Sequence, residues 1–312
     1  MANKPCCIDI YQGDDVSDHP TSLAGLDRVK ATGVFACIHK ATEGTGERDS
    51  RYDARRAKWM SGAPISVTDV DGAKLSLAPV WGAYHFFHGN NPKDEAGNFL
   101  MTARLTQTDM AFLDWEAVGA SGFQPSLEAA DTFCQIVEAA TGRPCGVYGG
   151  NVPRERFEAE KPSDAVLERF AARPFWMCAY VSGDLAAVEK YIALPWLKTK
   201  SVWLWQDDGD RYGPGPHTMP GIANYCDNST VLGSMTFAKL HAQWIGAAEP
   251  VVVAPPPKPK PAPPPPAPVV PSSPPPAPPV VATDDKKSRM EQLREEMEQL
   301  TAAIEKEIER DV

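Results

Sequence analysis

Residues 109–116 read DMAFLDWE, a continuous apolar run that ends in two acidic side chains. Continuous apolar runs of this length are typical of strands in a parallel sheet that helices cover on both faces. Similar runs recur along the chain and alternate with segments whose apolar residues have helical spacing. The alternation predicts an α/β fold in which residues 109–116 form one strand of a parallel sheet.

The remaining elements follow from the same patterns. The expected strands lie at 6–12, 34–42, 79–87, 109–116, 144–149, 175–181, 201–207 and 223–228. The expected helices lie at 21–32, 50–61, 93–105, 126–141, 163–172 and 236–246. Eight strands in about 250 residues fit a closed barrel. Because the helix signals weaken between the last strands, we expect an irregular TIM-like (β/α)5β3 barrel, with an inserted hairpin at 64–78 around Asp71-Gly72.

Proline divides the chain into three parts. Seventeen of the 31 prolines lie within 250–282, whereas all 8 tryptophans and all 7 cysteines lie within 1–249. We therefore expect a catalytic barrel at 1–249 and a Pro-rich linker at 250–282. The linker favours polyproline II, which makes it a semi-rigid spacer, with an SH3-type ligand as the alternative.

The last segment, 283–312, contains neither glycine nor proline. Its apolar residues repeat at spacings of three and four, as a heptad seam requires: Met290, Leu293, Met297, Leu300 and Ile304. We expect a short coiled-coil-like helix that pairs with itself or with another protein, and a solvated single helix is the alternative.

Composition excludes several classes of protein. The formal net charge is −10 and no basic patch is present, which argues against nucleic-acid binding. No apolar run reaches the roughly 18 residues that a membrane span needs, and the N-terminus shows no secretory signal. The 7 cysteines form no CxxC pair, so we expect free thiols in a reducing compartment and no metal site or cofactor.

Four acidic residues are candidates for chemistry. Asp114 and Glu116 lie two apart, so a strand would point both carboxylates to one face, and Trp115 to the other. Two such carboxylates have separated pKa values, which divides the roles of proton donor and charge stabiliser in glycoside hydrolysis. The alternative is two exposed acids at the start of a loop. Asp9, within CCIDIYQ, is either functional or bonded to loop amides, and Asp227 is either functional or a turn residue.

Aromatic residues gather near the expected strand ends, where sugar rings pack on them or where they fill the barrel: Tyr11, Tyr84, Phe86, Tyr148, Tyr180, Trp203, Trp205 and Tyr225. A metal site is the minor alternative, because His39, His85 and His88 lie on or beside neighbouring strands. No matching set of ligands accompanies these histidines, and no GxSxG motif indicates a serine hydrolase.

The segments resemble, in order, those of glycoside hydrolase family 25, the Chalaropsis-type lysozymes. The similar motifs cover residues 6–235: an acidic opening CIDIYQG at 7–13, KATEG at 40–44, GAYHF at 82–86, the D-x-E pair at 114–116, G-x-P-x-x-x-Y at 142–148, A-Y at 179–180, W-Q at 205–206 and D-N at 227–228. The opening is two residues shorter than the family's. The hairpin at 64–78, the linker and the last helix are not part of the family core.

The resemblance implies hydrolysis of the β-1,4 bond between N-acetylmuramic acid and N-acetylglucosamine in peptidoglycan, with retention at the anomeric carbon. It implies that Glu116 is the general acid/base, with Asp114 as its partner and Asp9 and Asp227 as the other acids of the cleft. The implied substrate-binding residues are Gln12, Lys40, Glu43, Tyr84, Tyr148, Tyr180, Trp205 and Gln206.

Three biological roles remain open on the sequence. The first is a phage or prophage endolysin that accumulates in the host cytoplasm and reaches the cell wall after holin-type release. The second is a virion structural protein of the tail or baseplate, whose lysozyme domain is anchored when the C-terminal helix docks on a phage protein. The third is a wall-binding module without activity, which the preserved acids disfavour.

Overall fold

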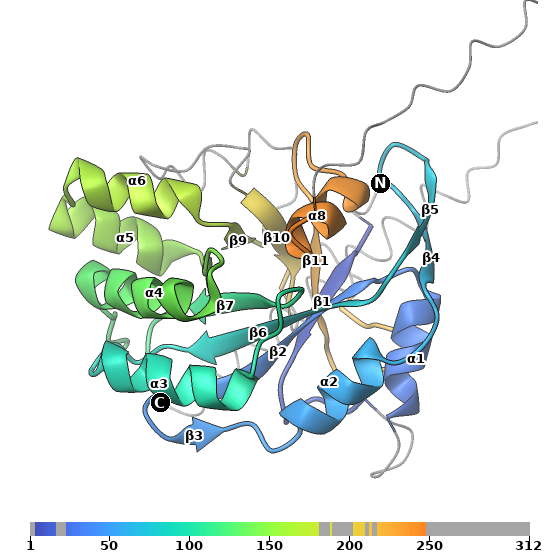
Figure 1. The fold of residues 1–312 in the computed structure, drawn as a ribbon, viewed down its shortest axis with the longest axis horizontal. Coiled ribbons are helices and arrows are strands. Elements are labelled where there is room, and N and C mark those ends of the chain that lie inside the picture. The colour runs from blue at the N-terminus through green and yellow to red at the C-terminus, as the bar shows by residue number, and fades with distance from the viewer. Residues whose placement is uncertain are drawn as a thin grey trace, which may run out of the picture. The chain divides into compact units, whose positions relative to one another are not determined.

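Eight strands close into a barrel in the computed structural model, which describes residues 4–16, 23–180, 188, 202–209, 212–213 and 217–247 (Figure 1). The barrel strands are β1 (Cys7–Ile10), β2 (Ala36–Glu43), β6 (Val80–Phe86), β7 (Met110–Asp114), β8 (Gly146–Gly149), β9 (Phe175–Cys178), β10 (Val202–Asp208) and β11 (Asp227–Thr230). Their order is β1-β2-β6-β7-β8-β9-β10-β11, and β11 pairs with β1 to complete the ring. All neighbours are parallel except β11, which is antiparallel to both β1 and β10. The expected irregular α/β barrel is confirmed.

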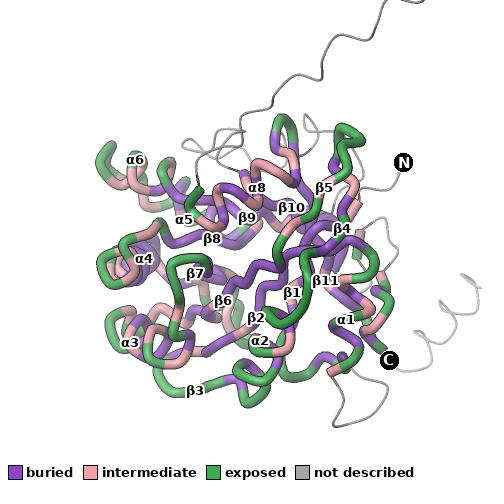
Figure 2. The backbone as a smooth tube through the Cα atoms, turned by 45° about the vertical axis from the view of Figure 1, so that its right-hand side comes forward, coloured by how far each residue is buried: buried purple, intermediate pink, exposed green. Residues whose placement is uncertain are grey.

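Helices follow the first five barrel strands along the chain and lie outside them (Figure 1). They are α1 (Ala24–Ala31), α2 (Tyr52–Met60), α3 (Pro92–Ala103), α4 (Leu127–Thr141), α5 (Asn151–Glu160) and α6 (Asp164–Ala172), and α8 (Phe237–Trp244) comes after the last strand. Figure 2 shows the barrel strands largely buried and parts of the surrounding helices exposed, so the apolar strand runs lie in the interior. The expected linker at 250–282 and helix at 283–312 lie outside the described residues.

Two elements differ from the expectation. The last strand begins at Asp227, not at residue 223, because Ala223 and Cys226 instead donate backbone hydrogen bonds to the loop residues Asp15 and His217. Its sequence Asp-Asn-Ser-Thr is polar, so no apolar alternation marks it. Helix α5 was not expected, since only Val152, Pro153 and Phe157 are buried along it and the helical period is weak.

Helix α8 packs against the amino ends of the barrel strands. The indole nitrogen of Trp244 donates to the carbonyl of Trp81 at 2.9 Å, and its ring lies 5.7 Å from that of Phe112 inside the barrel. Gly82 makes this approach possible, because a Cβ there would meet Trp244 at 3.1 Å. The barrel is therefore filled by side chains below the ends where its parallel strands stop.

The inserted hairpin, β4 (Ile65–Thr68) and β5 (Lys74–Leu77), supports this helix. The carboxylate of Asp69, in the hairpin turn, accepts the backbone N–H groups of Phe237 at 2.7 Å and Ala238 at 3.1 Å. Phe237 and Ala238 are the first two residues of α8, and the N–H groups at the start of a helix have no acceptor within the helix. The hairpin thus caps α8 and lies at the end of the barrel opposite the carboxyl ends of the parallel strands.

We expect Asp69→Ala to lower the free energy of unfolding by about 1–2 kcal/mol, because two buried helix N–H groups lose their acceptor. Urea denaturation measures the change. The matched control is Asp71→Ala in the same turn, whose exposed carboxylate accepts only the N–H of Ala73 among the bonds described for it. Equal losses for the two variants would contradict a capping role for Asp69.

Candidate functional site

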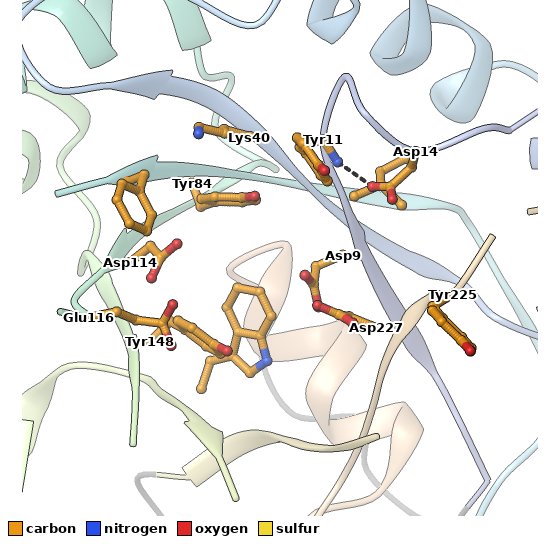
Figure 3. Close-up of a pocket in the computed structure, with 13 residues that line it drawn as sticks. Asp9, Tyr11, Asp14, Lys40, Tyr84, Asp114, Glu116, Tyr148, Tyr225 and Asp227 are labelled. Carbon is orange, nitrogen blue, oxygen red and sulfur yellow. Dashed lines mark hydrogen bonds between the residues drawn. The ribbon is translucent and has the colours of Figure 1, made fainter. Parts of the chain in front are cut away.

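A cavity of about 310 Å³ opens at the carboxyl ends of the parallel strands (Figure 3). Nine of its lining residues belong to the barrel strands: Asp9, Ile10, Lys40, Tyr84, Phe86, Asp114, Tyr148, Trp176 and Asp227. The others are Tyr11, Asp14, Glu116 and Tyr225. Parallel strands place their carboxyl ends at one rim, and the antiparallel β11 contributes its first residue, Asp227, to the same rim.

Asp114 and Glu116 share one wall of the cavity. Asp114 is the last residue of β7 and is 7% exposed. The chain stays extended beyond it, because the N–H of Trp115 donates to the carbonyl of Tyr148 on β8 at 3.1 Å. The Trp115 ring points the other way, and its nitrogen donates to the carbonyl of Pro125 at 3.0 Å. Alternation along the extended chain therefore brings both carboxyl groups to the cavity.

The electrostatics of this pair favour a retained proton. Burial, reinforced by the neighbouring Glu116, raises the pKa of Asp114 well above its usual value, whereas the Lys40 ammonium acts in the opposite sense. Burial and the Asp227 carboxylate raise the pKa of Glu116. Asp114 Oδ1 is buried with no hydrogen-bond partner among the described residues, so it is oriented by its strand rather than by a donor.

Asp9 and Asp227 lie side by side on the facing wall, as Figure 3 shows. They are directly paired residues of the antiparallel strands β1 and β11, so their side chains project to the same face. Burial, then Asp227 and Asp14, raises the pKa of Asp9 well above its usual value. The cavity thus holds two pairs of carboxyl groups on opposite walls, with Asp14 as a fifth.

Lys40 is the one basic side chain among the described residues that line the cavity. Its ammonium group donates to the carboxylate of Glu43, which also contacts the Nε2 atom of His88 at 3.0 Å. Lys40 also lies 5.1 Å from the centre of the Phe86 ring, a cation–π contact. Glu43 therefore holds the lysine at the rim without lining the cavity itself.

Aromatic side chains form the rest of the surface. Tyr84, Tyr148 and Trp176 line the cavity, and the Tyr148 and Trp176 rings lie 4.3 Å apart. The indole nitrogen of Trp176 donates to Ser229 on β11 at 3.0 Å, which fixes the ring across the barrel. Tyr11 and Tyr225 are about half exposed at the rim. Flat apolar walls above buried carboxyl groups suit a polar ring with C–H faces.

The other residues expected to bind substrate lie outside the cavity lining. The side chain of Gln12 accepts from Ser50, and the exposed Tyr180 ring stacks on Tyr212 at 5.8 Å. Trp205 is buried and donates to the carbonyl of Ala179 at 2.8 Å, and its neighbour Gln206 is 1% exposed within β10. Neither these residues nor Glu43 line the cavity, and their role in substrate binding stays a prediction.

Three cavity residues, Ile10, Asp14 and Trp176, were not singled out from the sequence. Asp14 belongs to a turn after β1 and has no strand pattern that could reveal its direction. Trp176 stands within an apolar strand, where a tryptophan is ordinarily assigned to the core. The residues around Asp14 show no periodic pattern, so the sequence does not indicate its role.

Two features of the described residues bear on alternative functions. Within the described residues, no group of three or more His, Cys, Asp or Glu side chains is arranged to hold a metal ion. His85, considered above as a ligand, instead bonds Thr42 at 2.7 Å and Glu95 at 3.0 Å in the core. None of the described helices combines the length and the apolar character that crossing a membrane requires.

Comparisons with known proteins agree with this geometry. Residues 72–213 match the family model described as "Glycosyl hydrolases family 25". Among solved structures, a bacterial lysozyme from Streptomyces coelicolor is 19% identical with a TM-score of 0.54, over 77% of this chain and 97% of that one. A muramidase from Acremonium alcalophilum is 20% identical with a TM-score of 0.52, over 77% of this chain and 98% of that one. A family 25 lysozyme from Aspergillus fumigatus is 17% identical with a TM-score of 0.53, over 77% of this chain and 98% of that one. These likenesses concern the fold, and no curated protein sequence matches the chain.

Proposed function

We propose that this chain is a glycoside hydrolase of family 25 and, more narrowly, a lysozyme, and the match of residues 72–213 to the model of that family supports this. Its substrate is the glycan strand of peptidoglycan, and it cleaves the β-1,4 bond between N-acetylmuramic acid and N-acetylglucosamine. The observation that carries this proposal is the cavity in which Asp114 and Glu116 meet Asp9 and Asp227 between aromatic walls.

Glu116 is the general acid. Since Asp114 is buried and Glu116 is half-buried beside it, the two carboxyl groups together retain a proton. Burial and Glu116 raise the pKa of Asp114 against the effect of Lys40, and burial and Asp227 raise the pKa of Glu116. The pair therefore shares this proton, and Glu116 delivers it to the glycosidic oxygen.

The reaction follows from this division. Glu116 gives its proton to the bridging oxygen as the bond from the anomeric carbon breaks, and the leaving sugar departs with a new hydroxyl group. Positive charge develops at the anomeric carbon and is stabilised by the Asp114 carboxylate. Glu116, now ionised, then removes a proton from the water that completes hydrolysis. Asp9 and Asp227 bind the sugar from the facing wall, and Tyr84, Tyr148 and Lys40 line its path.

Analysis of the products tests the proposal. Digestion of purified peptidoglycan, followed by borohydride reduction and mass spectrometry, is expected to give reduced muramic acid at every new end. Reduced glucosamine at the new ends would indicate a glucosaminidase and contradict the proposal. The absence of new reducing ends, with folded protein, would contradict glycan hydrolysis altogether.

The cell wall is the site of action for this activity, and the thiols support folding in a reducing compartment. All seven cysteines are free and six are buried, as in proteins that fold in a cytoplasm. Holin-type release, a phage origin and docking of the C-terminal helix stay predictions. The alternative of a virion structural protein gains no support from the comparisons, and its anchoring helix lies outside the described residues.

A further inference from the structure

The turn after β1 is fixed by three separate parts of the fold. The Asp14 carboxylate accepts the N–H of Tyr11 at 2.7 Å, and the Asp14 N–H donates to the carbonyl of Tyr11 at 3.0 Å. From α2, the guanidinium of Arg55 donates to the carbonyls of Tyr11 and Asp14, each at 2.5 Å. The N–H of Gln12 donates to Asp49 at 2.7 Å. A turn held in this way presents its side chains in one arrangement.

Arg55 makes most of its described contacts with this turn. Its side chain is fully buried, and its third described contact is with the Nε2 atom of His39 at 3.3 Å. Burial lowers the pKa of His39 to about 3, so the ring is neutral and accepts this bond. A buried cation with two carbonyl oxygens and a neutral imidazole as its described partners serves to hold the backbone between Tyr11 and Asp14.

The turn places Asp14 in the lining of the cavity that also holds Asp9, and Figure 3 shows Asp14 next to Tyr11. Asp14 is 8% exposed, and its second oxygen accepts from the amide of Asn224, which precedes β11, at 3.4 Å. Both carboxylate oxygens of Asp14 thus accept N–H donors, and the Arg55 guanidinium lies behind it. Donors and a nearby cation both favour the ionised form of a carboxyl group.

Asp9 has the opposite surroundings. Its Oδ2 atom is buried and has no hydrogen-bond partner among the described residues. Four carboxyl groups face it, from the turn, from β11 and from the end of β7: Asp14, Asp227, Asp114 and Glu116. Lys40 is the cation of the cavity, and the nearby Tyr84, Cys7, Cys37 and Cys226 stay neutral because burial raises the pKa of each. These surroundings favour the protonated form of Asp9, and the charge of Asp14 is one of those that favour it.

We propose that Asp14 is a positioning residue for hydrolysis: held by Arg55, its charge keeps the Asp9 carboxyl protonated, so that Asp9 presents an O–H donor to a glycan oxygen. The inference rests on the proposed function for the identity of the acceptor. Its electrostatic part concerns only the chain's own residues and is testable without substrate. Asp14 acts through Asp9, and the variants below separate its charge from its place in the turn.

The first test follows the Asp9 carboxyl by ¹³C NMR in the full chain labelled at aspartate, with the resonance assigned by its loss in Asp9→Asn. In Asp14→Asn the titration midpoint of Asp9 is expected to fall by about one pH unit, because a like charge is removed. Asp14→Glu, which keeps the charge, is expected to restore most of the midpoint. The matched control is Asp15→Asn, which removes the same charge from an exposed neighbour. An unchanged midpoint in Asp14→Asn would overturn the proposal.

The second test measures binding of a soluble tetrasaccharide of alternating N-acetylglucosamine and N-acetylmuramic acid. The Glu116→Gln background prevents both hydrolysis and titration of Glu116. The affinity of the Glu116→Gln variant for the tetrasaccharide is expected to fall as pH rises through the pKa of Asp9. When Asp14→Asn is combined with Glu116→Gln, the fall in affinity is expected at a pH about one unit lower. If Asp14→Asn shifts the NMR titration midpoint of Asp9 but leaves the pH dependence of tetrasaccharide binding unchanged, Asp14 has a structural role and the proposal is overturned. Muramic-acid ends in the product analysis, with no pH-dependent binding here, would leave the proposed function intact and overturn only this inference.

The role of Arg55 is tested in the same way. Arg55→Lys keeps a cation but cannot bond both carbonyls in the fork geometry, so the Asp9 midpoint is expected to move in the direction seen with Asp14→Asn. The matched control is Arg56→Lys, one residue along α2, whose guanidinium bonds Asp109 instead. Thermal unfolding confirms that each variant is folded at the temperature of the titration. Equal midpoints for Arg55→Lys and Arg56→Lys would remove Arg55 from the proposal.

Discussion

Replacement of Glu116 by glutamine is expected to reduce the release of reducing ends from peptidoglycan by about 10²–10⁴-fold, the usual contribution of a general acid. The amide has nearly the shape of the protonated carboxyl group but cannot release a proton to the leaving oxygen. Burial and the Asp227 carboxylate raise the pKa of Glu116, so the wild-type enzyme carries this proton at a pH where an ordinary glutamate has lost it. The alkaline limb of its pH–rate profile is therefore expected above the usual range of a glutamate.

The control is Glu158→Gln, which changes an exposed carboxylate on α5 that does not line the cavity. It is expected to keep wild-type turnover. Circular dichroism and thermal unfolding of Glu116→Gln are expected to match the wild type, because no described hydrogen bond of the fold depends on its carboxyl group. Retention of more than about a tenth of the activity would assign the proton transfer to another residue.

Replacement of Asp114 by asparagine is expected to reduce turnover by about 10²–10³-fold and to stabilise the fold at alkaline pH. The loss of activity follows from removing the negative charge that faces the developing positive charge. The gain in stability follows from burial, since the side chain is 7% exposed and one of its oxygens has no partner among the described residues. Asparagine fills the same space but carries no charge, so it avoids the free-energy cost of burying an ionised carboxylate.

The sign of the pH dependence follows from the raised pKa of Asp114. The folded state holds this proton at a pH where the unfolded chain releases it. The contribution of Asp114 to stability is therefore fully present below the pKa of the unfolded chain, near 3.9, and is lost as pH rises through the folded pKa. Asp114→Asn lacks this loss, so the difference in unfolding temperature between variant and wild type is expected to grow with pH.

Thermal unfolding at pH 5 and pH 8 measures this difference. A gain of about 1 kcal/mol at the higher pH corresponds to roughly 2–4 °C for a domain of this size. An unfolding temperature below that of the wild type at both pH values would show that the carboxylate stabilises the fold, and would contradict the electrostatic interpretation. Unchanged turnover would separately remove Asp114 from the reaction.

The wall that carries the proposed catalytic pair was predictable because it depends on local geometry. Asp114 and Glu116 stand two apart at the end of an apolar run, and an extended chain places such residues on one face whatever surrounds it. The same holds for Lys40 and Tyr84, which lie within strands whose apolar pattern sets their direction. Gln206 shows the limit of this reasoning, because it lies on a strand beside the site and is nevertheless buried away from the cavity lining.

The facing wall depends on pairing between distant segments. Asp9 and Asp227 lie 218 positions apart in sequence and become neighbours only through the antiparallel register of β1 and β11. The strand that carries Asp227 is too polar to be placed from its pattern, and its start was expected four residues early. Asp14 depends on still more, since Arg55, Asp49 and Asn224 must converge on one turn before its carboxylate reaches the cavity.

The run at 109–116 by itself determined that a strand would end in two carboxyl groups on one face, because side-chain alternation is a property of the extended backbone. The repetition of such runs determined an α/β barrel, because each needs cover on both faces. Closure of the barrel decided what these carboxyl groups meet: Asp227 against Asp9, the Lys40 ammonium near Asp114, and Asp14 in a turn held by Arg55. The charges that act on the Asp114–Glu116 pair come from segments far apart in the chain, and only their packing into one cavity makes them interact strongly.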